Sequence, residues 1–317
     1  MRQTYTALLA FLLAVPAWGQ LRVTVISDLN GHYGSRRYEA TVPRAVARIL
    51  EMKPDLVLSL GDMVAGERRR PRLTRRGLEP MWGAFHRLVS NPIRLAGIPL
   101  AVVPGNHDAS AYAGYEEDRR IFREQWEARR PQVQFVASDQ YPFQYAFSAG
   151  GVLFAGLDGT ITGPFPAATR SWLRELLAAR GGAYRWRVVF THVPLFPFAG
   201  ADQRETVSDP EMEAVFREGK VDLVLSGHHH AYYHGWSDGI LWVSQACIGA
   251  GPRALRGMRT VSPRAITTIE FPAVGPLVIR ALRAPDFREP LDLRELPTSI
   301  RSPYRELRRL DLAAGPR

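Results

Sequence analysis

The sequence predicts an α/β protein in which helices pack against mixed β-sheets. Short β-branched runs such as LRVTVIS at Leu21–Ser27 alternate with amphipathic segments, an order that is typical of βαβ units. A second observation is Ala149-Gly150-Gly151 between two apolar runs, which predicts a β-hairpin and therefore antiparallel pairing in the same fold. The 317 residues are 46% hydrophobic and 23% charged, which is ordinary globular usage and excludes disordered, collagen-like and coiled-coil classes.

The elements can be predicted in order along the chain. The first helix surrounds Val46, Ile49 and Leu50, which have helical spacing, and Thr41 is expected to be its N-cap. The other predicted elements are strands at Asp55–Leu60, Ile98–Val103, Phe143–Ser148, Val152–Leu157, Arg187–Thr191, Val221–Ser226, Leu241–Ser244, Ile266–Phe271 and Leu277–Leu282, a helix at Thr169–Arg180 ended by Gly181-Gly182, and a helix opened by Asp209-Pro210 and closed by Gly219.

Charge and cysteine content exclude several functional classes. The chain has 41 basic and 31 acidic residues, a net charge of +10, and Lys53 and Lys220 are its only lysines. High basicity can indicate a nucleic-acid partner, but no recognition motif and no basic–aromatic stripe supports one here. Cys247 is the only cysteine, so an intrachain disulfide and cysteine-rich zinc or iron–sulfur sites are excluded.

Both ends of the chain differ from its centre. Residues 1–19 have a basic start at Arg2, an apolar run at Ala7–Ala17 and a small-x-small cleavage site at Ala17-Trp18-Gly19, which together predict a signal peptide. We therefore expect an exported protein, periplasmic or secreted, with no membrane span after cleavage. Residues 20–283 are the expected catalytic domain, and 284–317 a charged, proline-containing C-terminal extension with little strand or helix.

Five short polar motifs each follow a predicted strand. Binding crevices in open α/β sheets form at the carboxyl ends of strands, so these motifs predict one shared site. If the last motif is extended, His228 and His230 face the same way into a single pocket. Carboxylates mixed with imidazoles suit Zn, Mn or Fe. The motifs are Ser27-Asp28-Leu29-Asn30, Gly61-Asp62, Gly105-Asn106-His107-Asp108, Thr191-His192 and Gly227-His228-His229-His230.

In this order, the five motifs resemble the signature of the calcineurin-like metallophosphoesterases. The resemblance covers roughly Leu21 to Leu282 and rests on the combination of Gly-Asn-His-Asp with Gly-His-His-His. It implies a four-layer α/β/β/α sandwich, two mixed sheets flanked by helices, with a dinuclear metal site at the strand ends. It also implies hydrolysis of a small-molecule or macromolecular phosphoester by a metal-activated hydroxide, with two divalent or trivalent ions (Mn, Zn or Fe) as cofactors.

The resemblance also implies a role for each motif residue. Asp62 would bridge both metal ions, and His107 would protonate the leaving oxygen or stabilise the phosphoryl charge. Asp108 would orient the ring of His107. The remaining ligands would be Asp28, Asn30 and His230 at the first metal, and Asn106, His192 and His228 at the second.

One position departs from the pattern of the family, and another from the pattern of its nearest rival branch. The family has histidine two residues after its first aspartate, where this chain has Asn30; His32 is an alternative ligand if the backbone through Gly31 is extended. The purple acid phosphatase branch is the nearest rival, because Gly227–Tyr232 (GHHHAY) resembles its last motif. That branch has a tyrosinate ligand where this chain has Ala65, which argues against an iron–phenolate centre.

Alternatives remain at this level. The chain can be read as a purple-acid-phosphatase-like phosphomonoesterase, or as a non-catalytic protein that binds phosphorylated ligands, although retention of His107 and Asp108 argues against the latter. The six arginines of Arg68–Arg76 predict a solvated loop, with a substrate-steering lip as the alternative. Three further histidines, His86, His229 and His234, are expected to be surface or packing residues.

Overall fold

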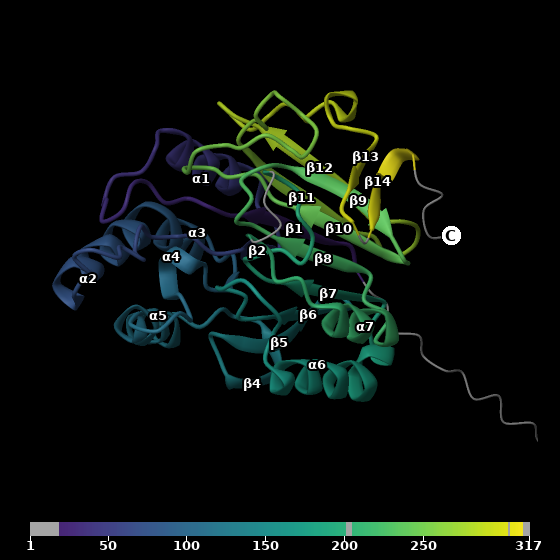
Figure 1. The fold of residues 1–317 in the computed structure, drawn as a ribbon, viewed down its shortest axis with the longest axis horizontal. Helices are drawn as coiled ribbons and strands as arrows, with labels where there is room; N and C mark the ends of the chain where they lie inside the picture. Colours follow the sequence, from purple (N-terminus) through teal and green to yellow (C-terminus); the bar gives the residue numbers. More distant parts are fainter. Residues whose placement is uncertain (1–18, 201–204, 304, 313–317) are drawn as a thin grey trace, which may run out of the picture.

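The computed structural model describes residues 19–200, 205–303 and 305–312, and contains two β-sheets (Figure 1). The five-stranded sheet has the order β12-β11-β1-β2-β3. Its centre is parallel, with β1 beside β2 and β2 beside β3, while β11 and β12 add antiparallel strands on the other side of β1. The strands are β1 (Leu21–Ile26), β2 (Leu56–Ser59), β3 (Leu100–Val102), β11 (Ala265–Phe271) and β12 (Val278–Arg283).

The second sheet has nine strands in the order β13-β14-β9-β10-β8-β7-β6-β5-β4. Its four central strands, β6, β7, β8 and β10, are parallel to one another. Strands β5 and β6 form the antiparallel hairpin that the sequence predicts. The strands are β4 (Gln134–Gln140), β5 (Gln144–Ala149), β6 (Val152–Gly156), β7 (Trp186–Phe190), β8 (Leu223–Ser226), β9 (Tyr233–Ser237), β10 (Ile240–Ser244), β13 (Ser299–Arg301) and β14 (Glu306–Arg309).

Helices cover the outer faces, which gives the predicted four-layer sandwich. On the nine-stranded side, α6 and α7 lie side by side (Figure 1). Phe216 of α7 packs against Trp242 of β10. On the other side, α1 buries Val42 and Ile49 against the core. The helices are α1 (Thr41–Met52), α2 (Arg75–Phe85), a π-helical turn (His86–Ser90), α3 (Asn91–Leu95), α4 (Asn106–Ala109), α5 (Glu116–Glu127), α6 (Ala167–Arg180) and α7 (Pro210–Glu218), with short 3₁₀ turns at Gly181–Ala183, Leu293–Glu295 and Leu310–Leu312.

The inner faces of the two sheets pack on each other through large aromatic side chains. The rings of Phe154 in β6 and Phe271 in β11 lie 5.9 Å apart, edge to face. Across the same interface, the hydroxyl of buried Tyr145 accepts from the backbone N–H of Val102 at 3.0 Å and donates to its carbonyl at 2.7 Å. The Tyr145 contact holds β5 against the carboxyl end of β3, which is the end that the Asn106 motif follows. The Phe154–Phe271 contact lies toward the opposite end of the small sheet, because Phe271 pairs with Leu21 at the start of β1.

Several expectations about local structure are wrong. Thr41 does not cap α1; its hydroxyl donates to the carbonyl of Ile248, and Ala40 is the N-cap residue, without a side-chain bond. The residues after Ala284, expected to contain little strand or helix, supply β13 and β14 to the large sheet. By contrast, Asp209 caps α7 as expected, since its carboxylate accepts from the N–H of Met212.

The predicted signal peptide lies almost entirely outside the described residues, which begin at Gly19. Within the part of the chain that the structure describes, no helix has the length and apolar character needed to cross a bilayer.

Candidate metal centre and active site

The five polar motifs meet where parallel strands of both sheets end. Asp28 follows β1, Asp62 follows β2, and the Asn106 turn follows β3; His192 and His228 follow β7 and β8 of the other sheet. The loops approach so closely that two motif glycines have no room for a side chain. A Cβ on Gly105 would clash with the backbone and carboxylate of Asp62, and a Cβ on Gly227 would clash with the hydroxyl of Ser27.

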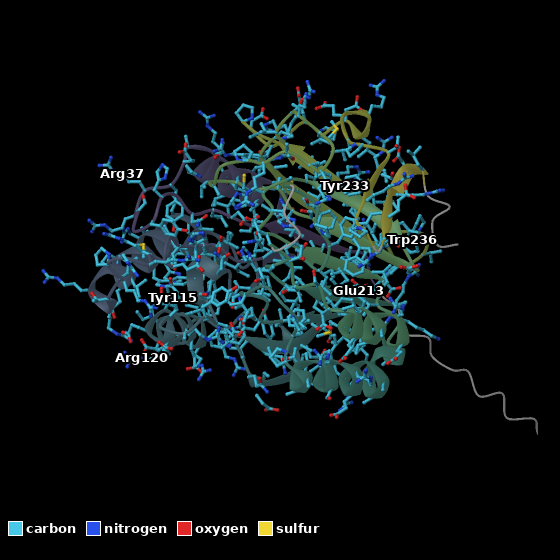
Figure 2. All side chains as sticks on the ribbon, in the orientation of Figure 1. Arg37, Tyr115, Arg120, Glu213, Tyr233 and Trp236 are labelled. Atoms are coloured by element: carbon cyan, nitrogen blue, oxygen red, sulfur yellow. The ribbon has the colours of Figure 1, made fainter. Side chains whose placement is uncertain are left out.

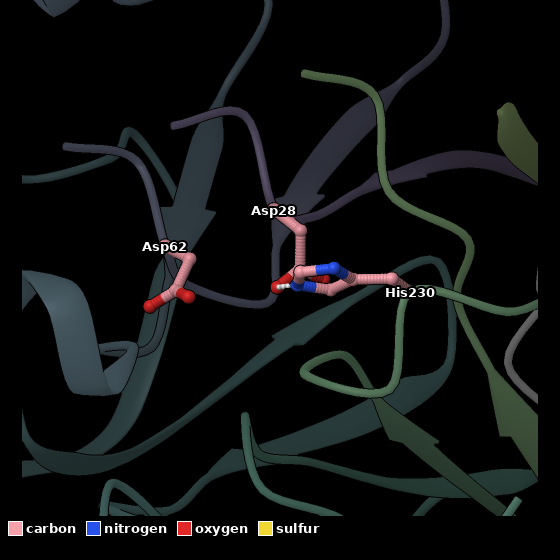
Figure 3. A group of neighbouring side chains, drawn as sticks. All are labelled: Asp28, Asp62 and His230. Atoms are coloured by element: carbon pink, nitrogen blue, oxygen red, sulfur yellow. Dashed lines mark ion pairs between the residues drawn. The ribbon is translucent and has the colours of Figure 1, made fainter. Parts of the chain in front are cut away.

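One group of ligand atoms comes from Asp28, Asp62 and His230, which all lie within 4.8 Å of one another (Figure 3). Nε2 of His230 is 3.1 Å from Oδ1 of Asp28, and Nδ1 of His230 bonds to the carbonyl of Gly251 at 2.8 Å. That bond places the ring proton on Nδ1 and leaves the Nε2 lone pair facing the carboxylates. The group is therefore arranged as a cation site.

Asn30, on the loop that carries Asp28, offers a fourth candidate ligand atom. Its side chain is 4% exposed, and its backbone N–H donates to the carbonyl of Asp62. Among the described residues, Oδ1 of Asn30 has no hydrogen-bond partner although it is fully buried. A buried polar atom without a partner costs roughly 1–3 kcal/mol, so its presence here fits a ligand position. His32, by contrast, is exposed at the rim.

A second group surrounds the amide oxygen of Asn106. Oδ1 of Asn106 lies 2.9 Å from Nε2 of His192 and 3.0 Å from Nδ1 of His228. Asp62 reaches this group too, because its Oδ1 is 3.4 Å from Nε2 of His192. Nδ1 of His192 bonds to the carbonyl of Leu60 at 2.7 Å, which leaves Nε2 as the ligand atom. Asp62 thus belongs to both groups, as a bridging ligand requires.

The backbone that presents these ligands is not extended, contrary to the assumption made for His228 and His230. Both residues have left-handed backbone angles, with φ of 65° and 53°, and so do Asp28 at 53° and Asp62 at 54°. Non-glycine residues adopt this region at a cost of about 1–3 kcal/mol each, and such residues cluster at functional sites. The two histidines therefore reach the site by sharp turns rather than by strand alternation.

The electrostatics of the site favour cations. Burial raises the pKa of the Asp62 carboxyl, but the charges of His192 and His107 outweigh burial and hold that pKa well below its ordinary value. Burial lowers the pKa of His192, yet Asp62 overcomes this and raises it to about 9. Positive charge is therefore stabilised between these residues, which is the field a metal ion needs. Burial and neighbouring His192 lower the pKa of His228, so its imidazole is neutral and has a lone pair to offer.

His107 lies beside the two groups. Its backbone N–H donates to Oδ1 of Asp62 at 2.9 Å, its Nδ1 bonds to the carbonyl of Gly66 at 3.3 Å, and its Nε2 is 3.7 Å from Oδ2 of Asp62. The ring is partly exposed and lies 5.0 Å from the ring of Tyr33. This arrangement directs Nε2 toward the space next to the bridging carboxylate.

Asp108 does not make its predicted contact with the ring of His107. Its Oδ1 accepts from the N–H groups of Met63 and Val64 at 2.8 and 2.9 Å, and its Oδ2 accepts from the N–H of Gly105 at 3.0 Å. Burial and the charge of Asp62 raise the pKa of Asp108, and the backbone donors oppose this. Asp108 ties the Asp62 loop to the Asn106 turn, and the carbonyl of Gly66 orients the histidine ring.

A cavity of about 430 Å³ opens beside these residues and is large enough for a small phosphoester. Asn30, His107 and His230 form part of its wall, together with Tyr33 and Arg264. Sequence reasoning missed Tyr33 and Arg264 because neither belongs to a motif. The predicted packing role of His229 holds: its Nδ1 accepts from the N–H of Phe198 and its Nε2 donates to the carbonyl of Glu205.

The basic run Arg68–Arg76 contains structural contacts. Arg75 begins α2 and forms ion pairs with Glu79, Glu117 and Glu124, while the guanidinium of Arg72 lies over the ring of Tyr115. Arg75 therefore joins α2 to α5, and Arg72 joins the loop before α2 to Tyr115, the residue before α5.

Replacing Asn30 by histidine should strengthen the first cation site. Imidazole is a better ligand than a neutral amide for Zn, whereas Mn accepts oxygen well. We expect Asn30→His to raise Zn affinity at one site by about 10–100-fold, the size of effect that metal-site partners have, and to change Mn affinity less. Calorimetric titration of both metals measures this. If Asn30→His and Asn30→Ala both leave the first isotherm unchanged, position 30 does not face the cation and His32 becomes the candidate.

Comparison with known proteins identifies the family of this chain. A family model for calcineurin-like phosphoesterases matches residues 21–232. Purple acid phosphatase 23 of Arabidopsis thaliana is 25% identical over 67% of this chain, which spans 47% of that relative. Two solved structures share the fold, each at 16% sequence identity. A purple acid phosphatase from yellow lupin (Lupinus luteus) seeds has a TM-score of 0.64, and the match covers 84% of this chain and 52% of that one. A dimetal phosphatase from Danio rerio has a TM-score of 0.59, and the match covers 86% of this chain and 98% of that one. The ordered motifs, the two-sheet fold and the family match together show that this chain belongs to the calcineurin-like phosphoesterase family.

Proposed function

We propose that this protein is an exported phosphoester hydrolase that works with two metal ions, and that its substrate is a phosphomonoester. The observation that carries the proposal is the pair of ligand groups sharing Asp62, with His107 beside them at a cavity of about 430 Å³. The similarity to purple acid phosphatases supports a monoester over a diester.

The donor set fits two ions. Asp28, Asn30, Asp62 and His230 would hold the first, and Asp62, Asn106, His192 and His228 the second. Two bound cations would acidify a water and neutralise charge on the phosphoryl oxygens. Ala65, which is buried, offers no phenolate, so we propose a centre without a tyrosinate ligand.

The protein's own residues carry out the remaining tasks. Nε2 of His107 is placed to give a proton to the leaving oxygen, because the carbonyl of Gly66 fixes the other ring nitrogen. Two buried carboxylates, Asp28 and Asp62, neutralise only half of the charge of two divalent ions. The remaining positive charge attracts the phosphate dianion into the cavity.

An assay on purified protein tests the proposal. After removal of metal by chelation and dialysis, 4-nitrophenyl phosphate should not be hydrolysed, and adding Mn or Zn should restore turnover. Bis(4-nitrophenyl) phosphate tests the monoester preference in parallel. Full activity after exhaustive chelation would contradict metal dependence. Two bound metals without turnover on either ester would instead support a phospho-ligand-binding protein.

Export rests on the N-terminal sequence, and it predicts a processed chain. Protein isolated from its native host should begin near Gln20, because signal peptidase cleaves after small residues such as Gly19. Intact-mass spectrometry measures the mature N-terminus. Retention of Met1 or Arg2 on the native protein would contradict the proposal.

A further inference from the structure

The Asp62 loop holds the Asn106 turn through a series of short contacts. Asp108 accepts from two N–H groups of the loop, Asp62 accepts from the backbone of His107, and Gly66 accepts from the ring of His107. The last contact in this series is made by Glu67, a residue outside all five motifs. Its Oε2 accepts from Nδ2 of Asn106 at 2.7 Å.

This contact determines which way the Asn106 amide faces. A carboxylate can only accept hydrogen bonds, so it pairs with the NH₂ end of the amide and never with the oxygen. The amide oxygen is then directed to the opposite side, where Oδ1 lies 2.9 Å from His192 and 3.0 Å from His228. Without this partner, the amide would lose the one contact that recognises its NH₂ end, and its oxygen would be directed by the two histidines alone.

Glu67 is itself held in place by its surroundings. Its backbone has a φ of 60°, in the left-handed region that non-glycine residues rarely adopt. Its carbonyl accepts from the hydroxyl of Tyr115 at 3.3 Å, and Tyr115 precedes α5 (Figure 2). The preceding Gly66 allows the close approach, because a Cβ there would clash with the carbonyl of His107. The side chain is only partly exposed, which shields its bond to Asn106 from water.

We propose that Glu67 is a positioning residue: it selects the orientation of the Asn106 amide and thereby pre-forms the second cation site. The inference rests on the two-metal site of the proposed function. Partners that orient a metal ligand typically contribute 10–100-fold to metal affinity. Glu67 is not assigned as a ligand, so its effect should be confined to the group containing Asn106.

Calorimetric titration of the full-length protein with Mn and with Zn tests the proposal. Glu67→Met keeps the size of the side chain and removes the acceptor, and should weaken one of the two sites by about 10–100-fold. Glu67→Gln can still accept from Nδ2 through Oε1, so it should recover most of that affinity. Glu67→Ala also removes the acceptor but has a much smaller side chain, so it should weaken the same site as Glu67→Met. Thermal melts of all variants show whether they are folded.

Glu213→Met is the matched control. Glu213 is also partly buried and forms an ion pair with Arg305, and it lies far from Tyr115 along the long axis of the molecule (Figure 2). Its replacement should lower thermal stability and leave both metal affinities unchanged. If Glu67 had only a structural role, Glu67→Met would behave like this control, with a lower melting temperature and unchanged metal binding. That result would overturn the proposal.

A double-mutant cycle gives the second criterion. Because Glu67 acts through Asn106, Glu67→Met should weaken metal binding no further in the Asn106→Ala background. Fully additive losses would overturn the positioning role. The wild type separates the two hypotheses: if it binds no cation the proposed function fails, whereas two normal sites in both wild type and Glu67→Met refute only the role of Glu67.

Discussion

His107→Ala should keep both metal ions and lower kcat by roughly 10²–10⁴, the range expected for loss of a general acid. His107 contacts Asp62 through its backbone N–H at 2.9 Å and through Nε2 of its ring at 3.7 Å, so alanine keeps the closer of these contacts. Neither ligand group uses a side-chain atom of His107. Metal content should therefore be unchanged.

The choice of leaving group provides the internal control for this variant. Nitrophenolate leaves without protonation, so the loss on 4-nitrophenyl phosphate should be much smaller than on an alkyl phosphate. Steady-state kinetics on both substrates, with metal analysis of the same samples, measures the contrast. Equal losses of kcat on both substrates would contradict the role of His107 as a general acid. Loss of metal from the variant would indicate that His107 is a metal ligand.

Asp62→Asn should remove most of the metal and nearly all activity. The amide is nearly the same size as the carboxylate and can still accept from the N–H of His107, so the change mainly removes charge. Because Asp62 belongs to both ligand groups, both cations lose their shared ligand. Metal ions contribute several kcal/mol to such a reaction, so we expect kcat to fall at least about 10³-fold.

Asp28→Asn is the matched comparison, since Asp28 belongs to only one group. It should lower the metal content by one equivalent, whereas Asp62→Asn should affect both. Metal analysis after gel filtration at a defined free-metal concentration distinguishes the two. If Asp62→Asn retained both ions at wild-type affinity, the bridging assignment would be wrong.

The sequence predicted the fold and the meeting of five motifs well, because both depend on local patterns. Buried strands carry β-branched runs, and a polar residue after such a run lies at a sheet end wherever the strand pairs. The missed helix α2 carries apolar Leu78, Met81, Trp82 and Phe85 at helical spacing, but it begins inside the arginine-rich run and contains Pro80. Helix α5 also had a signal, with three acidic residues in its first turn.

Tertiary contacts limited the prediction of the site. Asp108 bonds to backbone groups more than forty residues away, and Glu67 meets Asn106 across 39 residues, so neither role follows from a motif. The left-handed turns at His228 and His230 depend on the packing of loops from both sheets. Strand alternation predicted that these two side chains would converge, but that prediction assumed an extended backbone, which the chain does not adopt there.

The edge strands of the large sheet affect whether copies of this protein self-associate at high concentration. A sheet edge with free N–H and C=O groups is a template for pairing with another molecule, and proteins disfavour this with short, charged or irregular edges. Here β14 pairs with β9, and β13 presents an edge of only three residues that ends in Arg301. The opposite edge strand, β4, has register shifts between Phe135 and Gln140. Trimming the chain after Arg283 would uncover Gly235 and Trp236 of β9, where β14 now pairs, so a shortened protein should self-associate. The full chain keeps both edges of this sheet unsuited to edge-to-edge pairing.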